Sequence, residues 1–200
     1  RSNVIGTQFE HHRPFGGVVP EIAARAHLDM MLPAIDRAFV EAGATYADVE
    51  GVAVTAGPGL VGALLVGVAA AKSIALAHDL PFIGVNHLEG HVCATQLEFG
   101  HLEPPMISLI VSGGHTSLVL LDAEGRFETI GQTIDDAAGE AFDKIARFMG
   151  LPFPGGPEID KLGRTGDPTA IAFPRAMMND GTLDFSMSGL KTAVIRELRR

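Results

Sequence analysis

The stretch "GVAVTAGPGLVGALLVGVAAAKSIALAHDLPFIGVNH", residues 51–87, decides the fold class. It reads as a short β-branched strand, a long apolar helix and a second apolar strand. The unbroken apolar run of the helix is too short for a membrane span, and Lys72 lies too centrally within it. We therefore expect a helix that is buried against a sheet.

The rest of the chain continues this alternation of helices and strands. Helices are predicted over residues 20–42, 87–97, 135–149, from about Glu158 and within 183–198, with a strand over 106–113 and a hairpin turning at Glu124-Gly125. Pro33 should kink the first of these helices. The pattern predicts an α/β protein with a mixed sheet. Residues 98–106 are expected to separate an N-terminal lobe, 1–103, from part of a C-terminal lobe, 104–200.

Composition narrows the function classes. The 200 residues, 46% of them hydrophobic, suffice for one large or two small α/β domains. A single cysteine, Cys93, excludes an intramolecular disulfide and fits a reducing, cytoplasmic setting. The net charge of −9 opposes general nucleic-acid binding but leaves room for a local patch or a partner subunit. The one basic concentration, Lys191, Arg196, Arg199 and Arg200, is interpreted as the solvated face of a helix rather than a binding patch.

The two ends suggest a piece of a longer protein. The chain starts at Arg1 without a methionine and ends on "KTAVIRELRR", a helical run without a stop signal. Sites that draw on both ends of a longer chain would then be incomplete.

The segment "NHLEGH" places His87 and His91 four residues apart. On a helix both imidazoles share one face and can ligate one ion. Glu89 points about 160° away, so the segment does not match the zinc-protease pattern H-E-x-x-H, in which the glutamate is the general base. Surface or capping histidines are the alternative, but the preceding strand favours a ligand site, since such sites gather at strand carboxyl ends.

The segment "VSGGHT", residues 111–116, ends an apolar strand in Ser-Gly-Gly. This predicts a tight turn that exposes consecutive backbone N–H groups, a nest suited to an anion that His115 could also face. An ordinary glycine turn between two strands is the alternative.

An acidic helix follows in "DDAAGEAFDK". Asp135 is predicted to be its N-cap. Helical spacing places Asp136, Glu140 and Asp143 in one stripe, which would face solvent, a cation or a polyhydroxy ligand. Lys144 is predicted to be a local counter-charge.

The segment "PGGPEID", residues 154–160, predicts a turn that opens a helix at Glu158. Such a turn can cradle a phosphate or nucleotide, and Asp160 can accept hydrogen bonds from ribose hydroxyls. A capped surface turn is the alternative, and the chain has no Walker A or GxGxxG pattern.

In order, "FGGVVPEIAARAH", "TAGPGLVGALLVG", "NHLEGH", "VSGGHT", "DDAAGEAFDK", "PGGPEID" and "FSMSGLKT" resemble the TsaD family, tRNA threonylcarbamoyladenosine-synthesis proteins once called O-sialoglycoprotein endopeptidases. The resemblance runs from about Phe15 to the last residue. It implies a fold of the actin and Hsp70 ATPase type, with two ribonuclease-H-like lobes, both incomplete here, and a nucleotide in the cleft between them.

The resemblance also implies a reaction and its site. The threonylcarbamoyl group would pass from threonylcarbamoyl-AMP to N6 of adenosine 37 in tRNAs that read ANN codons, releasing AMP. His87 and His91 would be two ligands of one divalent ion, with Fe(II) preferred over Zn(II). The adenylate would be held by Val111, Ser112, Gly113, Gly114, His115, Asp143, Gly156 and Asp160. No catalytic nucleophile is assigned, because the mixed anhydride is already activated.

Partners and rivals follow from the same resemblance. It implies tRNA, a TsaB-like paralogous subunit and a TsaE-like ATPase as partners in the cytoplasm, without a membrane, and leaves a homodimer open. Family members carry a first strand and turn ahead of residue 1, and an aspartate metal ligand is expected beyond residue 200, so we expect this chain alone to be inactive. Gln132 stands where members of the family commonly carry a glutamate just before the acidic pair Asp135-Asp136.

Two rival functions remain for this chain. One is a metalloprotease that uses His87 and His91, and the other is a non-catalytic scaffold.

Overall fold

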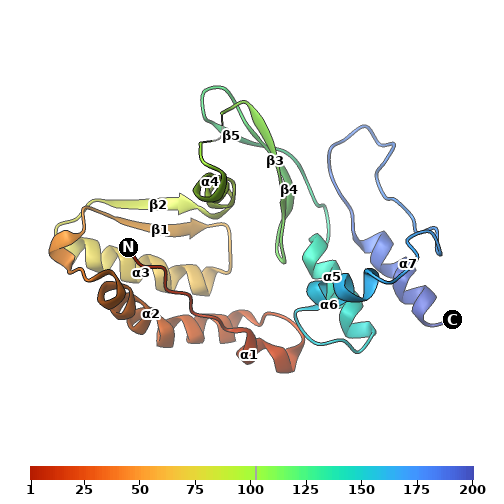
Figure 1. Cartoon of the computed structure of the whole chain (residues 1–200), viewed down its shortest axis with the longest axis horizontal. Helices are drawn as coiled ribbons and strands as arrows, with labels where there is room; N and C mark the ends of the chain where they lie inside the picture. Colours follow the sequence, from red (N-terminus) through yellow and green to blue (C-terminus); the bar gives the residue numbers. More distant parts are fainter. Residues whose placement is uncertain (102) are drawn as a thin grey trace. The chain divides into compact units, whose positions relative to one another are not determined.

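The stretch that decides the fold forms the predicted strand, helix and strand in the computed structural model, which describes residues 1–101 and 103–200. These elements are β1 (Val52–Gly57), α3 (Val61–Ala77) and β2 (Phe82–Asn86). β1 and β2 pair in parallel, and α3 lies along the pair as the connecting helix (Figure 1). A parallel pair requires a crossover of this kind, which explains why the long apolar run between the strands is helical.

The chain divides into two units, Arg1–His91 and Val92–Arg200, each described below by itself. The division falls inside the helix α4 (His87–Phe99). The lobe limits of 1–103 and 104–200 stay a prediction.

The helices of unit 1 pack through small side chains. Its remaining elements are α1 (Phe9–His12), η1 (Arg13–Phe15), α2 (Pro20–Ala42) and η2 (Tyr46–Asp48). Alanines occupy buried positions on both α2 and α3. A Cβ atom at Gly62 would come within 3.0 Å of the Ala24 Cβ, so this glycine permits the close approach of the two helices. α2 continues as one helix through Pro33.

Unit 2 begins with an antiparallel sheet in the order β3-β4-β5. Its elements are β3 (Met106–Val111), β4 (Thr116–Leu121), β5 (Phe127–Gln132), α5 (Ala138–Phe148), α6 (Gly155–Gly163) and α7 (Ser188–Leu198). The central strand β4 is the most buried of the three. The predicted hairpin turn is confirmed: Gly125 has a φ of 79° and donates its N–H to the Asp122 carbonyl at 3.0 Å.

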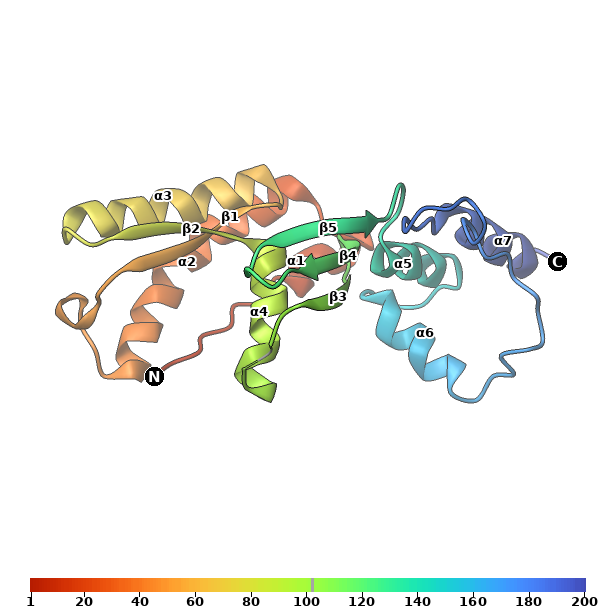
Figure 2. The same ribbon diagram turned by 90° about the horizontal axis from the view of Figure 1, so that it is seen from above.

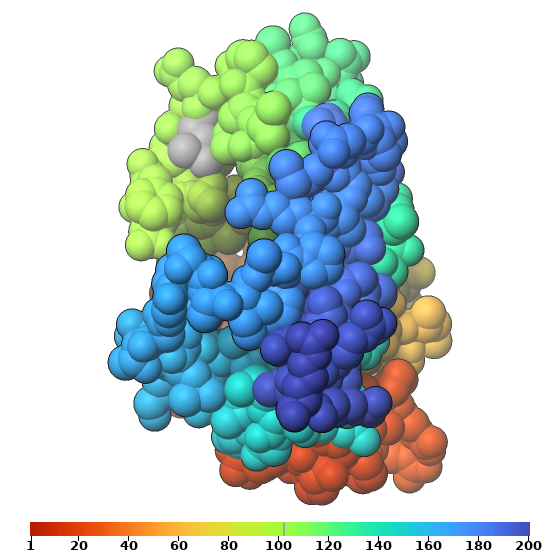
Figure 3. Space-filling model, turned by 90° about the vertical axis from the view of Figure 1, so that its right-hand side faces the viewer, coloured from red at the N-terminus to blue at the C-terminus, as the bar shows by residue number. Residues whose placement is uncertain are grey.

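The helices of unit 2 gather around α5, which contacts both α6 and α7 (Figure 2). The segment before α7 joins the end of β5: Phe185 donates its N–H to Gln132 O at 2.9 Å and accepts from Ile134 N at 2.9 Å. A Cβ atom at Gly131 would overlap the carbonyl of Leu183, so a glycine is required at this crossing. Figure 3 shows the chain that follows α6, together with α7, covering one face of the unit.

Two predicted helix starts are wrong. The helix predicted from Asp135 begins at Ala138, and the one predicted from about Glu158 begins at Gly155. In both cases a contact with a distant segment sets the first residue of the helix, and the local sequence pattern does not show that contact. The helix predicted within residues 183–198 is confirmed as α7, Ser188–Leu198. Within the described ranges, no helix combines the length and apolar character that crossing a bilayer requires.

Candidate functional site

The histidine pair lies where β2 runs into α4. The Asn86 side-chain carbonyl accepts hydrogen bonds from the N–H groups of Leu88 at 2.9 Å and Glu89 at 3.4 Å, which caps the start of the helix. This cap fixes His87 in the first turn and His91 one turn later. Their Nε2 atoms lie 3.2 Å apart, and the rings meet edge to face with centroids 4.5 Å apart.

The Nε2 separation is what two ligands of one ion require. With metal–nitrogen distances of about 2.0–2.1 Å and tetrahedral angles, two ligand nitrogens lie about 3.3 Å apart. A direct hydrogen bond between two neutral imidazoles gives a similar distance, so the pair fits a metal without requiring one. Across residues 1–101 and 103–200, no group of three His, Cys, Asp or Glu side chains is arranged to hold an ion.

The predicted nest lies in unit 2, in the turn of residues 112–115 between β3 and β4. Ser112 N donates to His115 O at 2.8 Å, which closes the turn. The N–H groups of Gly114 and His115 point at the Ser112 hydroxyl oxygen, at 3.4 and 3.0 Å. The turn therefore curves successive amides around one oxygen atom, as an anion-binding nest does. Cβ atoms built on Gly113 and Gly114 would meet nothing within 4 Å, so this side of the turn is open.

The turn is fastened to the first residues of α5 by two hydrogen bonds. Gly139 N donates to Ser112 O at 3.1 Å, and Ala138 N donates to the Thr116 hydroxyl at 2.8 Å. A Cβ atom at Gly139 would lie 2.6 Å from Ser112 O and 2.8 Å from Gly113 Cα. The close approach of the turn to the helix thus depends on the missing side chain at residue 139.

Asp143, in the middle of α5, connects this helix to α6. Its Oδ1 atom accepts the Gly155 N–H at 2.7 Å, which satisfies the first orphan amide of α6. Gly155 is buried and close to Asp143, because a Cβ atom at residue 155 would lie only 3.0 Å from the Asp143 Cα. The next residue, Gly156, has open space, since its nearest neighbour is the Phe142 Cβ at 3.9 Å. Asp143 and Gly156 are therefore brought together at the amino end of α6.

Asp160 lies one turn further along α6, on the same side as Gly156. Its carboxylate pairs with Arg164 at 2.9 Å, and its side chain is 67% exposed. The structure thus connects the turn, Asp143 and Gly156 through α5, whereas Asp160 reaches them only along α6. The two histidines belong to unit 1 and form a separate local constellation.

Asp135 does not cap α5, whose N-cap residue is Ala137. Its carboxylate accepts instead from the Ser186 hydroxyl at 2.6 Å, from Met187 N at 2.8 Å and from Ser188 N at 3.3 Å, at the start of α7. Burial raises the pKa of Asp135, but these hydrogen bonds outweigh it and leave the pKa below its usual value. Asp135 is thus an anchor for α7.

The predicted acidic stripe is also wrong, because Asp136 precedes the helix. Its carboxylate binds Lys144 at 2.6 Å and, through the other oxygen, Lys191 of α7. Burial raises the pKa of Asp136, but the two lysines outweigh it and the pKa is lowered. The bonds to Asp136 and then Glu140 raise the pKa of Lys144. Lys144 therefore neutralises these two acids rather than Asp143.

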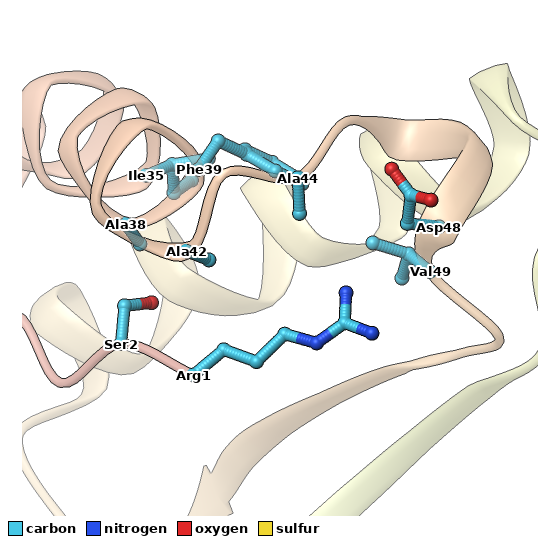
Figure 4. A pocket seen from close by; sticks show the side chains of 9 residues that line it. All are labelled: Arg1, Ser2, Ile35, Ala38, Phe39, Ala42, Ala44, Asp48 and Val49. Atoms are coloured by element: carbon cyan, nitrogen blue, oxygen red, sulfur yellow. The ribbon is translucent and has the colours of Figure 1, made fainter.

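A cavity of about 330 Å³ in unit 1 is lined by none of the predicted site residues. It lies beside the end of α2 and the start of the chain, and Figure 4 shows the Arg1 guanidinium reaching toward Asp48 and Val49. This cavity and the motif residues of the turn and the helix ends are therefore formed by different parts of the chain.

Sequence reasoning missed Gly139, Gly155 and Thr116 as residues that shape the site. A glycine inside the predicted helix 135–149 is the available signal for Gly139, because glycine within a helix weakens it unless a close approach requires it. Nothing local marks Thr116, whose partner lies 22 residues away.

Comparisons with known proteins agree with these motifs. The family model "TsaD: tRNA N6-adenosine threonylcarbamoyltransferase" matches residues 1–199. A tRNA N6-adenosine threonylcarbamoyltransferase from Moorella thermoacetica is 57% identical over 198 residues, covering 99% of this chain and 58% of that protein. A protein of the same name from Geobacillus kaustophilus is 56% identical over 197 residues, covering 98% of this chain and 57% of that protein. The chain therefore spans somewhat more than half the length of the curated relatives it matches.

Among solved structures, YeaZ from Pseudomonas aeruginosa aligns with a TM-score of 0.40 and 19% identity, covering 52% of this chain and 50% of that chain. This likeness is too low to add to the assignment, which depends on the family match. That match confirms the predicted fold class, an α/β protein of the actin and Hsp70 type. The chain belongs to the TsaD family of tRNA N6-adenosine threonylcarbamoyltransferases.

Proposed function

We propose that the full-length protein containing this chain transfers the threonylcarbamoyl group of threonylcarbamoyl-AMP to N6 of adenosine 37 in tRNAs that read ANN codons. The observation that carries the proposal is the 57% identity to an enzyme named for this transfer across 99% of the chain. The local geometry of unit 2 supports it, because an open glycine turn and the amino end of α6 are connected through one helix.

In this reaction the N6 amine attacks the carbamoyl carbon, the bond from that carbon to the phosphate oxygen breaks, AMP leaves with the electrons of that bond, and the amine proton passes to the departing phosphate or to solvent. The mixed anhydride is already activated, so the protein needs mainly to orient the reactants and to stabilise developing negative charge. No covalent intermediate on a serine, cysteine or lysine is required.

Each predicted residue then has a defined task. The amides of the 112–115 turn would hold the phosphate, with the Ser112 hydroxyl giving up its place to a phosphate oxygen. Asp143 Oδ1 accepts the Gly155 N–H, and the other carboxylate oxygen would then accept a hydrogen bond from a ribose hydroxyl. Gly156 would let the nucleotide approach the backbone of α6, and Asp160 would bind ribose from the same side.

His87 and His91 would hold one divalent ion, Fe(II) in preference to Zn(II), through the paired Nε2 atoms. When bound, such an ion supplies Lewis-acid stabilisation of an oxygen of the donor. Its third protein ligand would come from outside this chain.

The proposed partners are tRNA, a TsaB-like paralogous subunit and a TsaE-like ATPase. The net charge of −9 fits a protein that does not bind nucleic acid through a broad basic surface of its own, and thus one that shares tRNA binding with partners. The proposed compartment is the cytoplasm.

The test is reconstitution with threonine, bicarbonate, ATP, the adenylate-forming synthase, the partner subunits and unmodified tRNA. Mass spectrometry of the digested tRNA should detect the threonylcarbamoyl nucleoside only when the full-length protein is present. An unmodified nucleoside under all conditions, with every component shown to be active, would refute the proposal. Protease activity on casein that disappears in His87→Ala would instead favour the metalloprotease alternative.

A further inference from the structure

Thr116 is a buried hydroxyl residue with no task in the proposed reaction. It is the first residue of β4, directly after the glycine turn, and only 3% of its surface is exposed. Its side-chain oxygen accepts the Ala138 N–H at 2.8 Å. Ala138 is the first residue of α5, so this hydroxyl satisfies one of the amides that a helix start leaves unpaired.

Thr116 does from a distance what an N-cap residue does locally. The N-cap residue of α5, Ala137, has no side-chain acceptor to offer. The acceptor is supplied instead by the strand that leaves the turn. The helix start is thereby tied to the turn rather than to its own preceding residue.

The backbone of Thr116 reinforces the connection. Thr116 O accepts the Thr133 N–H at 2.8 Å, and the Thr133 hydroxyl donates to Asp136 O at 2.7 Å. The chain that leads into α5 is thus held at both of these points. With the bond from Gly139 N to Ser112 O at 3.1 Å, the turn and the first turn of α5 form one hydrogen-bonded piece.

We propose that Thr116 is a positioning residue for nucleotide binding, which sets α5, and with it Asp143, at a fixed place relative to the 112–115 turn. This inference rests on the proposed function of that turn. Thr116 itself touches neither phosphate nor ribose, and its effect is transmitted through the Ala138 amide.

The choice of variants follows from the hydrogen bond. Thr116→Val keeps the branched shape but removes the acceptor, leaving the partly buried Ala138 amide without its partner. Thr116→Ser keeps the acceptor and loses only a methyl group. Thr192→Val is the matched control, because the Thr192 hydroxyl also bonds a backbone group in unit 2, the Ser188 carbonyl, but within α7.

The experiment uses the full-length protein with its partners and two probes. AMP binding is measured by calorimetry, and KM and kcat for threonylcarbamoyl-AMP are measured by nucleoside mass spectrometry. We expect Thr116→Val to weaken AMP binding and raise KM by about tenfold or more, as for a lost hydrogen bond of about 1.4 kcal/mol per factor of ten. The kcat at saturation should stay within about twofold, because the reacting groups are unchanged. Thr116→Ser and Thr192→Val should stay within about threefold of the wild type in every parameter.

Hydrogen exchange supplies a readout that does not depend on activity. The amides of residues 138–141 should exchange faster in Thr116→Val than in Thr116→Ser, while α6 keeps its protection. If Thr116→Val fails to fold, Thr116→Ala removes the same acceptor without a new methyl clash and carries the same expectations.

Wild-type AMP affinity in the folded valine or alanine variant would overturn the role of Thr116. An equal loss of AMP affinity in Thr116→Ser would also overturn it, because that result would indicate that the packing of the methyl group matters rather than the hydroxyl acceptor. A wild-type protein that binds neither AMP nor the adenylate would refute the proposed function itself, an outcome distinct from both.

Discussion

Replacing Gly139 by alanine tests whether the glycine turn must lie directly against α5. The new Cβ atom would sit 2.6 Å from Ser112 O, whereas ordinary contacts begin near 3.4 Å. The turn must therefore retreat by about 0.8 Å. The hydrogen bond from residue 139 to Ser112 O, already 3.1 Å long, would then be lost.

The magnitude follows from opposing contributions. A lost hydrogen bond costs about 0.5–1.5 kcal/mol and crowding of a packed contact about 1–3 kcal/mol. Alanine in place of glycine in a helix contributes up to about 1 kcal/mol of stabilisation. We expect a net loss of about 1–4 kcal/mol in the free energy of unfolding. The displaced amides should weaken AMP binding by at least about tenfold, since a hydrogen bond to a charged group contributes about 1.5–3 kcal/mol.

Gly189→Ala is the matched control. Gly189 is the second residue of α7, as Gly139 is of α5, but a Cβ atom there meets nothing within 4 Å. Gly189→Ala should leave the AMP affinity unchanged and should keep or raise the melting temperature. Urea unfolding and calorimetry on the full-length proteins measure both effects. Gly139→Ala with wild-type stability and wild-type AMP affinity would refute the close fit between turn and helix.

Three further predictions concern charged and metal-binding groups. His91→Ala should reduce the bound divalent metal of the full-length protein to below about a tenth of the wild-type stoichiometry, as measured by elemental analysis, because one of the two paired Nε2 atoms is removed; unchanged metal content would contradict the pair as a ligand set. Asp136→Asn should make the free energy of unfolding less sensitive to acid. Because the folded-state pKa of Asp136 is lowered, its carboxylate stabilises the fold above its unfolded pKa of about 4, and this stabilisation is lost as the pH falls from there through the folded-state pKa. Equal acid sensitivity of the variant and the wild type in urea titrations at several pH values would contradict this role of Asp136. Asp160→Asn should weaken AMP binding several-fold while the melting temperature changes little, because its exposed pair with Arg164 contributes little to stability; a stability loss without an affinity loss would reverse that assignment.

Elements whose signals are local could be predicted from the sequence. β1, α3 and β2 follow from apolar runs of the right length, and the hairpin follows from Gly125, whose positive φ the turn requires. The histidine pair is predictable because spacing on one helix alone determines it. What a residue does within its own element is readable from its neighbours.

The errors arise where a side chain acts on a distant segment. Asp135 has the composition of an N-cap, yet its acceptor oxygens serve amides 52 and 53 residues further along the chain. Asp136 has helical spacing from Glu140 and Asp143, yet it pairs with a lysine 55 residues away. The local sequence indicates that such a carboxylate will accept hydrogen bonds, but it does not indicate from which donor. Tertiary packing determines which of several equivalent donors lies close to it.

The junction between β5 and the segment before α7 has a consequence for how unit 2 folds. Asp184 accepts the Gln132 N–H at 2.9 Å across 52 residues of chain. Contacts of such high sequence separation form only after loop-closure entropy has been overcome, which makes them late events. The hairpin and α5 can assemble first, and α7 docks onto them afterwards. A protease that nicks the exposed residues 164–170 of the folded protein should therefore leave the two pieces associated, whereas the same cut before folding should leave α7 undocked.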